Sequence, residues 1–325
     1  FGMRKHPILG YVRLHNGADI GGACGNPIYA AQSGTVTKAG YKLGADIMFA
    51  LDPAASEIYD TKKKKYELKG EGRSLTTDEM VKIAKGLTNA ASGRYGLAYW
   101  YTNFYFHSAL MNAFGGAVFD KDGNLTVNSP ATVASLNQMM TWYKKDGILP
   151  PEPSEALIAS LFNEGKAAMV INGPWFVGDI DKKINFGLAP LPLLDAAKKP
   201  LRPWMTIEGA YVAASSAKKD LAYELVKYLT SEEAGLVLAL EGRQLHTNKA
   251  IYANPKVSGD PVLKAFRDQL DNAEPMPNRP EMTMVWSPAT TAMNKIVKGN
   301  ATVEAALKEA ATTMQESIAA LRKGK

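Results

Sequence analysis

The sequence contains a single cysteine, Cys24, among its 325 residues. One cysteine excludes an internal disulfide and any metal site of the C-x-x-C type. Apolar stretches are short, and none reaches the roughly 18 residues that a membrane-spanning helix requires. The net charge of +6 is too small and too dispersed to indicate nucleic-acid binding. With 46% hydrophobic and 22% charged residues, the composition is that of a soluble globular protein.

Signatures of catalysis are also missing. The four histidines form no H-x-H pair, and the G-x-S-x-G, H-E-x-x-H and glycine-rich phosphate-binding motifs do not occur. His107 and His246 stand alone in the sequence, and the carboxylates are scattered. We therefore predict a protein that is not an enzyme and has no cofactor.

The start of the chain lacks two further features. It begins at Phe1 instead of a methionine, and no charged segment leads into an apolar stretch, so no signal peptide is visible. We expect a fragment of a longer sequence. Its length still suits two domains of about 100–200 residues each.

From Thr76 onward, apolar residues recur at helical spacing between short apolar strands, which is the α/β pattern. Thr76–Glu79 reads as a capping box, and Ser129-Pro130 as an N-cap with a proline at the first helical position. The pattern predicts a strand over 167–171 and helices that begin after 76 and 129, and over 154–163, 216–229, 232–240 and 303–321. A doubly wound body of this kind binds ligands at a crevice beside its strand ends.

Aromatic residues gather beside glycine, proline and asparagine in this part of the chain. Tyr105 and Phe106 are adjacent, Trp175 follows Asn172-Gly173-Pro174, and Trp204 and Trp286 each follow a proline-containing segment. Rings at turns and strand ends can stack on the C–H face of a sugar. Any one of these rings could equally belong to the hydrophobic core, so the prediction of a sugar site rests on their number.

Two long segments carry a resemblance to a known family. Residues 162–175 read FNEGKAAMVINGPW and residues 274–286 read EPMPNRPEMTMVW, with Leu191-Pro192 between them and Gly115-Gly116 before them. In order and spacing, these resemble the family 1 extracellular solute-binding proteins of the maltose-binding type.

The resemblance implies an α/β, type II periplasmic-binding fold with two lobes that close on an oligosaccharide. It also implies delivery of a maltodextrin-like sugar to the membrane subunits of an ABC importer, a periplasmic or extracellular location, and a monomer.

Site residues follow from the same resemblance. Tyr105, Trp175 and Trp286 match aromatic residues that stack on sugar rings, and Phe106 matches a neighbouring residue of the cleft. Asn103 stands where the family has a carboxylate that binds sugar hydroxyls. Two further expectations remain open for Glu208, which could face ligand hydroxyls or be a solvated or capping residue.

The N-terminal quarter resembles two other families. Residues 1–37, with His15 and Asp19, resemble an M23 (LytM-like) zinc endopeptidase, in which these two positions bind zinc. The H-x-H that would complete such a site is absent, so at most weak zinc binding is expected there. Residues 38–76 resemble enolase, but they span too few strands to close its barrel. We expect a chimeric chain.

The expected organisation is therefore an M23-like piece (1–37), an enolase-like piece (38–76) and a solute-binding body (77–325). Within that body, the second lobe would comprise about 77–203 and 256–325, and 204–255 would be a remnant of a first lobe that is mostly missing. Loss of that lobe would impair sugar capture and expose apolar helix faces. The alternatives are an M23-type peptidase acting on cell-wall peptides, an enolase-type lyase, and a scaffold without a ligand.

Overall fold

The computed structural model describes residues 2–5, 12–15, 41–45, 48–51, 59–60, 65–66 and 75–323. For the segments before residue 75 it describes the backbone alone. Cys24 and Asp19 lie outside the described residues.

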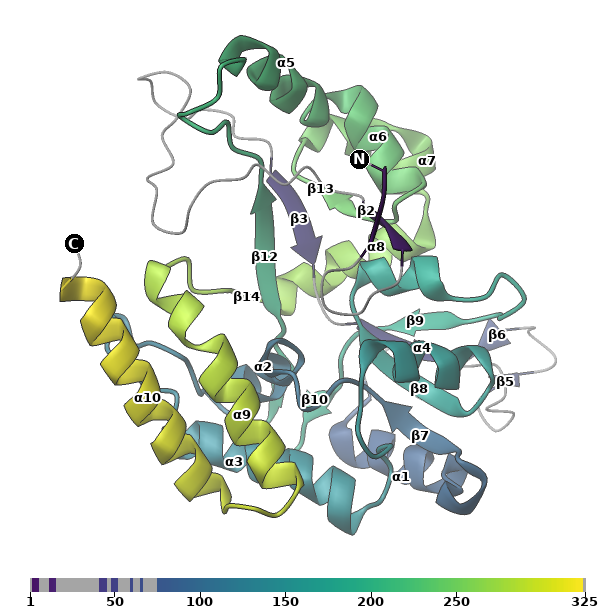
Figure 1. The fold of residues 1–325 in the computed structure, drawn as a ribbon. Coiled ribbons are helices and arrows are strands. Elements are labelled where there is room, and N and C mark those ends of the chain that lie inside the picture. The colour runs from purple at the N-terminus through teal and green to yellow at the C-terminus, as the bar shows by residue number, and fades with distance from the viewer. Residues whose placement is uncertain are drawn as a thin grey trace.

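From β7 onward, the described strands are interspersed with helices along the chain (Figure 1). The strands are β1 Gly2–Lys5, β2 Val12–His15, β3 Tyr41–Ala45, β4 Met48–Leu51, β5 Tyr59–Asp60, β6 Lys65–Tyr66, β7 Tyr95–Ala98, β8 Ala167–Asn172, β9 Gly187–Ala189, β10 Leu193–Leu194, β11 Lys199–Pro200, β12 Trp204–Gly209, β13 Leu245–His246 and β14 Glu274–Pro275. The α-helices are α1 Thr77–Leu87, α2 Phe104–Ala113, α3 Pro130–Met140, α4 Glu155–Asn163, α5 Lys219–Leu229, α6 Glu232–Leu240, α7 Pro255–Ser258, α8 Pro261–Gln269, α9 Trp286–Val297 and α10 Val303–Lys323. Shorter helical turns are η1 Ala90–Ser92, η2 Thr141–Lys145, η3 Pro174–Asp179, η4 Lys249–Ala253, η5 Leu270–Asn272 and η6 Pro280–Met284.

The predicted helices are confirmed, and their starts are capped as the sequence indicates. Thr76 accepts a hydrogen bond from the Glu79 backbone while the Glu79 carboxylate accepts one from the Thr76 backbone, which completes the capping box of α1. Ser129 caps α3 ahead of Pro130. That helix continues into the π-turn η2, after which Gly147 takes a positive φ of 66°.

One sheet has the strand order β7-β8-β4-β9. β7 runs parallel to β8, whereas β4 is antiparallel to both β8 and β9. Alternate residues of β8 pack on opposite faces of the sheet. Met169 lies in one hydrophobic cluster with Met80 of α1, and Val170 lies in another with Phe162 of α4. Helices therefore cover both faces, as a doubly wound body requires.

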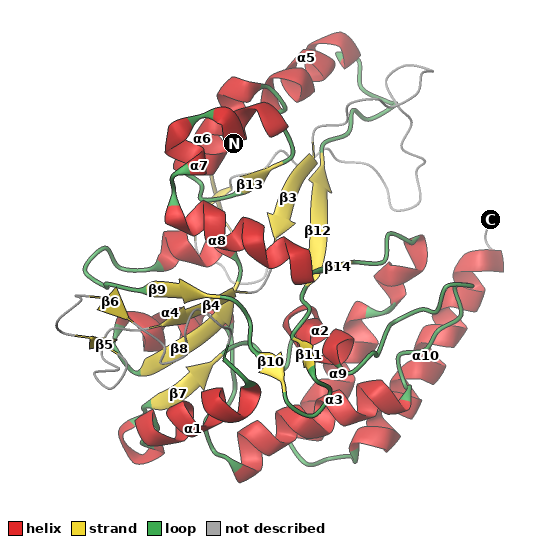
Figure 2. Ribbon diagram, turned by 180° about the vertical axis from the view of Figure 1, so that it is seen from behind, coloured by secondary structure: helices red, strands yellow, loops and turns green. Residues whose placement is uncertain are grey.

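A second sheet has the order β13-β3-β12-β14. It lies above the first in Figure 1, with α5, α6, α7 and α8 around it, and Figure 2 shows the same arrangement from behind. A third hydrophobic cluster unites Ala239 of α6 and Leu245 of β13 with Val257 of α7 and Phe266 of α8. Strands β3 and β4 are close neighbours in the sequence but belong to different sheets.

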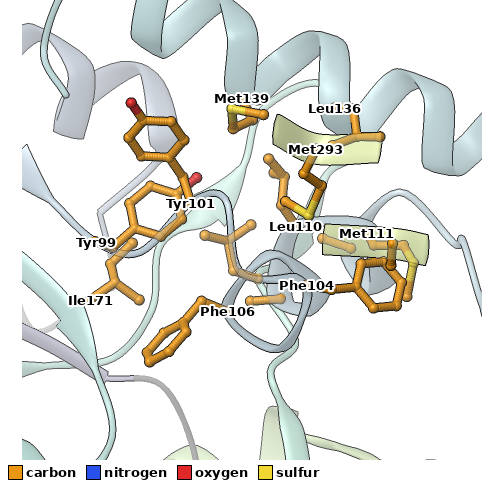
Figure 3. Packing of buried hydrophobic residues seen from close by; sticks show 14 of the residues in the cluster. Tyr99, Tyr101, Phe104, Phe106, Leu110, Met111, Leu136, Met139, Ile171 and Met293 are labelled. Atoms are coloured by element: carbon orange, nitrogen blue, oxygen red, sulfur yellow. The ribbon is translucent and has the colours of Figure 1, made fainter. Parts of the chain in front are cut away.

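The largest core lies beside the first sheet, where α2, α3, α9 and α10 pack together. α2 is buried on almost all sides, since Tyr105 is its one residue that is not buried, and it therefore lies at the centre of this bundle. Figure 3 shows Phe104 and Phe106 leaving the start of α2 toward opposite sides, and Leu110 and Met111 of the same helix belong to the same packed cluster. The first turn of α2 therefore sends Phe104 toward Trp204 and Trp286, and Phe106 toward Trp100 and Trp175.

The predicted exposure of apolar residues in the middle segment is confirmed. The large hydrophobic residues that remain most exposed in the described part of the chain all lie between residues 207 and 237: Ile207, Tyr211, Leu221, Tyr223, Leu225, Tyr228, Leu229 and Val237. None of the residues of α5 is buried. This helix is amphipathic, and its apolar face has no protein covering among the described residues.

Candidate ligand-binding site

Seven aromatic side chains form a connected group, here called the ring cluster: Trp100, Phe104, Tyr105, Phe106, Trp175, Trp204 and Trp286. They come from the start of α2 and the loop before it, from η3, from the first residue of β12 and from the first residue of α9. The sequence separates these segments by up to about 190 residues, and the fold brings them together.

The contacts within the cluster are mostly edge-to-face or tilted, the arrangements that aromatic quadrupoles favour. Trp204 lies 5.5 Å from Phe104, 6.3 Å from Tyr105 and 5.9 Å from Trp286 between ring centroids. The other centroid separations are 6.5 Å for Phe104–Trp286, 6.3 Å for Tyr105–Trp175, 5.8 Å for Tyr105–Phe106, 6.4 Å for Phe106–Trp175 and 6.2 Å for Trp100–Phe106.

Burial divides the cluster into two groups. Phe104, Phe106 and Trp204 are only 2%, 6% and 3% exposed. Tyr105, Trp175, Trp286 and Trp100 are half-buried. Half-buried rings keep part of their surface available to a ligand, and the buried rings support them from behind. The structure thus brings the three predicted stacking residues together, but it places Phe106 in the supporting group.

The local sequence explains how Trp175 reaches this place. β8 ends at Asn172, and Pro174 begins the helical turn η3 that carries Trp175. The indole lies directly over the α-carbon of Gly173, where any β-carbon would overlap the ring. Asn172 also stabilises the turn, because its side-chain oxygen accepts a hydrogen bond from the Gly173 backbone over 2.8 Å.

Asn103 has a structural role in addition to the predicted contact with ligand. It is the N-cap of α2, and its Oδ1 accepts a hydrogen bond of 2.9 Å from the backbone N–H of Tyr105. This bond fixes the first turn of the helix, which carries Phe104, Tyr105 and Phe106. The side chain remains half-buried, and its Nδ2 can donate to a hydroxyl.

The other predicted residues lie apart from the rings. Glu208 is exposed on β12, in register with Lys42 of β3. It shares a face of the strand with Trp204 but lies about 13 Å farther along. His15 ends β2, where only the backbone is described. Among the described residues, no three His, Cys, Asp or Glu side chains are grouped closely enough to hold a metal ion.

Sequence reasoning missed Phe104 and did not predict that Trp204 would be a buried, supporting ring. Phe104 carries no signal of its own, because it lies in an aromatic-rich run where any residue could be the buried one. Trp204 follows Pro203 in a turn-like context, yet it is buried. Phe104 and Trp204 lie at the centre of the cluster because the fold packs α2, β12 and α9 together, and the local sequence does not show this.

His107, the next polar residue of α2, is fully buried, and its Nε2 lies 2.8 Å from the hydroxyl of Ser135 on α3. Burial lowers the pKa of His107 to about 3, because a charged imidazole would lose its hydration. The ring is therefore neutral at physiological pH. It belongs to the packing between α2 and α3 and does not contribute a titrating group to the ring cluster.

Residues 29–236 match the sequence model of a family described as bacterial extracellular solute-binding protein. The match covers most of the chain, and it includes the whole 38–76 segment. None of the helices in the described part of the chain has the length and hydrophobicity of a membrane span.

Curated relatives bear names of sugar-binding proteins. The chain is 30% identical over 248 residues to a galactooligosaccharide-binding protein of Bacillus subtilis, covering 73% of this chain and 58% of that protein. It is 32% identical over 244 residues to a maltotriose-binding protein of Pyrococcus abyssi, covering 72% and 52%. The chain thus spans little more than half the length of these relatives.

Solved structures agree on the fold. The maltose/maltodextrin-binding domain of Bdellovibrio bacteriovorus, bound to maltotriose, superposes with a TM-score of 0.76 at 28% identity, covering 86% of this chain and 72% of that one. A cyclo/maltodextrin-binding protein in complex with maltotetraose gives a TM-score of 0.69 at 32% identity, covering 86% and 70%. These similarities agree with the predicted α/β, type II periplasmic-binding fold.

Proposed function

The chain belongs to the bacterial extracellular solute-binding protein family, and we propose that it binds a maltodextrin-like oligosaccharide as the substrate-binding component of an ABC importer. Its partners would be the sugar and the membrane subunits of that importer, and its place of action would be outside the cytoplasmic membrane. One relative, from Streptococcus pneumoniae, is named a maltooligosaccharide ABC transporter solute-binding lipoprotein.

The observation that carries this proposal is the presence of half-buried rings within the ring cluster. Tyr105, Trp175 and Trp286 each retain exposed surface while packing against other aromatic residues. A rigid aromatic ring offers a sugar a flat apolar surface at low entropic cost. We assign these three rings to stacking. Asn103 would provide hydrogen bonds to hydroxyl groups, and Phe106 would support the stacking rings.

Glu208 is a weaker member of the proposed site. Its side chain is exposed four residues along β12 from Trp204, so it would reach only a ligand that extends about 13 Å from the ring cluster along the strand. We retain it as a candidate for binding hydroxyl groups at the far end of a long oligosaccharide.

We also propose the domain division given by the sequence, with one change. The second lobe would contain residues 77–203 and the C-terminal helices, and the remnant of the first lobe would begin at Trp204. The third hydrophobic cluster groups Val257 and Phe266 with Leu245, so residues 256–272 fit better with the remnant. Because α5 exposes its apolar face, we expect this chain alone to capture sugar less tightly than its full-length relatives.

The chimeric origin of residues 1–76 stays a prediction. The family match covers the 38–76 segment, and β3 and β4 from that segment pair with β12 and β8. Both observations favour a solute-binding origin of this segment over an enolase-like one. Sequencing of the source DNA across residues 37 and 76 tests it. Reads that are uninterrupted across both positions in independent samples would exclude an assembly error.

Isothermal titration with maltotriose tests the proposed function. We expect saturable binding by the wild-type chain, and a loss of about tenfold in affinity in Trp175→Ala and in Trp286→Ala. Tyr223→Ala is the matched control, because Tyr223 is a half-exposed ring on α5 outside the ring cluster. Wild-type affinity in both tryptophan variants would contradict the assignment of the site.

A further inference from the structure

Trp204 is a buried ring of the cluster that contacts three other rings. Its ring contacts Phe104, Tyr105 and Trp286, and two of these three are proposed to stack on sugar. At 3% exposure, Trp204 has almost no surface of its own to offer a ligand. Any influence on binding must therefore pass through the rings it touches.

The backbone around Trp204 is fixed from the side of α2. The N–H of Arg202 donates to the carbonyl of Ala109 over 3.0 Å, and the side chain of Asn112 donates to the carbonyl of Arg202 over 2.7 Å. Both partners lie on the helix whose first turn carries Phe104 and Tyr105. Trp204 is thus held in register with two of the rings that it contacts.

The same stretch of backbone is also fixed from the side of β14. Glu274 donates to the carbonyl of Pro203 over 2.8 Å, and Met276 donates to the carbonyl of Met205 over 2.9 Å. The side chains of Arg202 and Glu274 form an ion pair of 2.6 Å across the two segments. Trp204 therefore lies at the junction between the helical bundle and the second sheet, with its neighbours bonded on both sides.

Anchoring of this kind leaves little freedom for the indole. The hydrogen bonds to α2 and β14 hold the backbone, and the ring itself is 3% exposed and packed between Phe104, Tyr105 and Trp286, so it cannot turn without displacing its neighbours. The edge-to-face contact with Trp286, at an interplanar angle of 89°, then fixes the ring at the start of α9. The tilted contact with Tyr105, at 57°, fixes the ring on α2.

We infer that Trp204 is a positioning residue for oligosaccharide binding, which sets the orientation of Tyr105 and Trp286 without touching the sugar. This inference rests on the proposed function. It predicts that an aromatic side chain is needed at position 204. Loss of that side chain should lower the affinity for maltotriose by more than its effect on the stability of the fold explains.

The test compares maltotriose affinity with stability in a set of variants of the full chain. Trp204→Leu removes the ring, and Trp204→Phe retains an edge that can contact Tyr105 and Trp286. Trp142→Leu is the matched control, because Trp142 is 1% exposed in the same core but is not a member of the ring cluster. Trp204→Met replaces Trp204→Leu if the latter does not fold.

We expect Trp204→Leu to weaken maltotriose binding about tenfold, and Trp204→Phe to recover most of the loss. Trp142→Leu should lower the unfolding midpoint at least as much while leaving affinity within about twofold. A folded Trp204→Leu or Trp204→Met variant with wild-type affinity would overturn the inference and leave the proposed function intact. So would an equal loss of affinity in Trp142→Leu. Absence of binding in the wild-type chain would overturn the proposed function and this inference with it.

Discussion

At the scale of single residues, the space above Gly173 determines where Trp175 can lie. A β-carbon at position 173 would overlap the indole ring, so only glycine allows the ring to pack over the backbone. The φ of this residue is −93°, which any amino acid can adopt. The requirement for glycine here is therefore one of space and not of backbone conformation.

Gly173→Ala should displace the Trp175 ring and weaken maltotriose binding several-fold, with a loss of stability of about 1–3 kcal/mol from overpacking. Titration calorimetry and urea unfolding measure the two effects. Gly178→Ala is the matched control in the same helical turn, since nothing lies within 4 Å of its added β-carbon. Equal affinities of the two variants would show that the position of the indole does not matter.

His107 makes stability depend on pH. Its pKa is lowered to about 3 in the folded chain, whereas an unfolded histidine titrates near 6.5. Between these values the unfolded chain binds the extra proton, so the free energy of unfolding falls as the pH falls below about 6.5. The loss from this residue should reach about 3 kcal/mol at pH 4.

Urea unfolding at pH 7, 5.5 and 4 measures this effect. His107→Gln cannot titrate in this range but retains a polar group for the bond to Ser135. Its stability should fall less between pH 7 and pH 4 than that of the wild type, because the contribution of His107 is gone while the other three histidines and the carboxylates still titrate. An identical pH dependence in the two proteins would exclude a neutral, buried His107.

From the sequence, the partly exposed aromatic residues could be predicted more reliably than the buried ones. Trp175 and Trp286 follow turn-forming segments, and both are half-buried. Trp204 follows Pro203 in a similar way but is buried, because α2 and α9 close over it. Burial of a ring depends on neighbours that are far away in the sequence, and local signals do not contain that information.

At the scale of elements, local signals were reliable where they involve the backbone of a few residues. The capping box at Thr76 and the N-cap at Ser129 predicted helix starts that the structure confirms. An Asp-Gly pair such as Asp122-Gly123 is typical of a hairpin turn between paired strands, but here it is flanked by a single bridge, between Phe119 and Leu125. Asp120 explains the difference, because its carboxylate accepts hydrogen bonds from the backbone of Asp122 and Asn124 and tightens the turn.

The exposed apolar face of α5 should make the chain associate at high protein concentration. Leu221, Leu225 and Leu229 recur at intervals of four residues and are 68%, 50% and 42% exposed, so they form a continuous stripe. Replacing Leu221 and Leu225 by lysine should reduce light scattering at high concentration. The free energy of unfolding should change by less than about 1 kcal/mol, because α5 buries no residue.

The control adds the same charges with the same spacing elsewhere. Gln315 and Ala319 are exposed on α10, so the double lysine variant at these positions tests the effect of net charge alone. Equal suppression of scattering by both double variants would assign the association to charge and exclude the α5 face as its cause.

At the scale of the whole molecule, the alternation of strands and helices after Thr76 predicted the α/β body correctly. It did not predict the pairing of β3 with β12 and β13 or of β4 with β8 and β9. Such pairings join residues more than 100 positions apart, and register of this kind is set by the packed sheet and not by the strand itself. The ring cluster is a second example, since its members come from four separate segments.

The central claim is that the described fold still binds a maltodextrin. A ligand that binds only the folded state stabilises it by about 2.7 kcal/mol at one hundred times its Kd. Thermal unfolding, followed by tryptophan fluorescence with and without millimolar maltotriose, therefore tests the claim most directly. We predict a cooperative transition that moves upward by several degrees as maltotriose is added. A cooperative transition that neither maltodextrins nor galactooligosaccharides displace would contradict it.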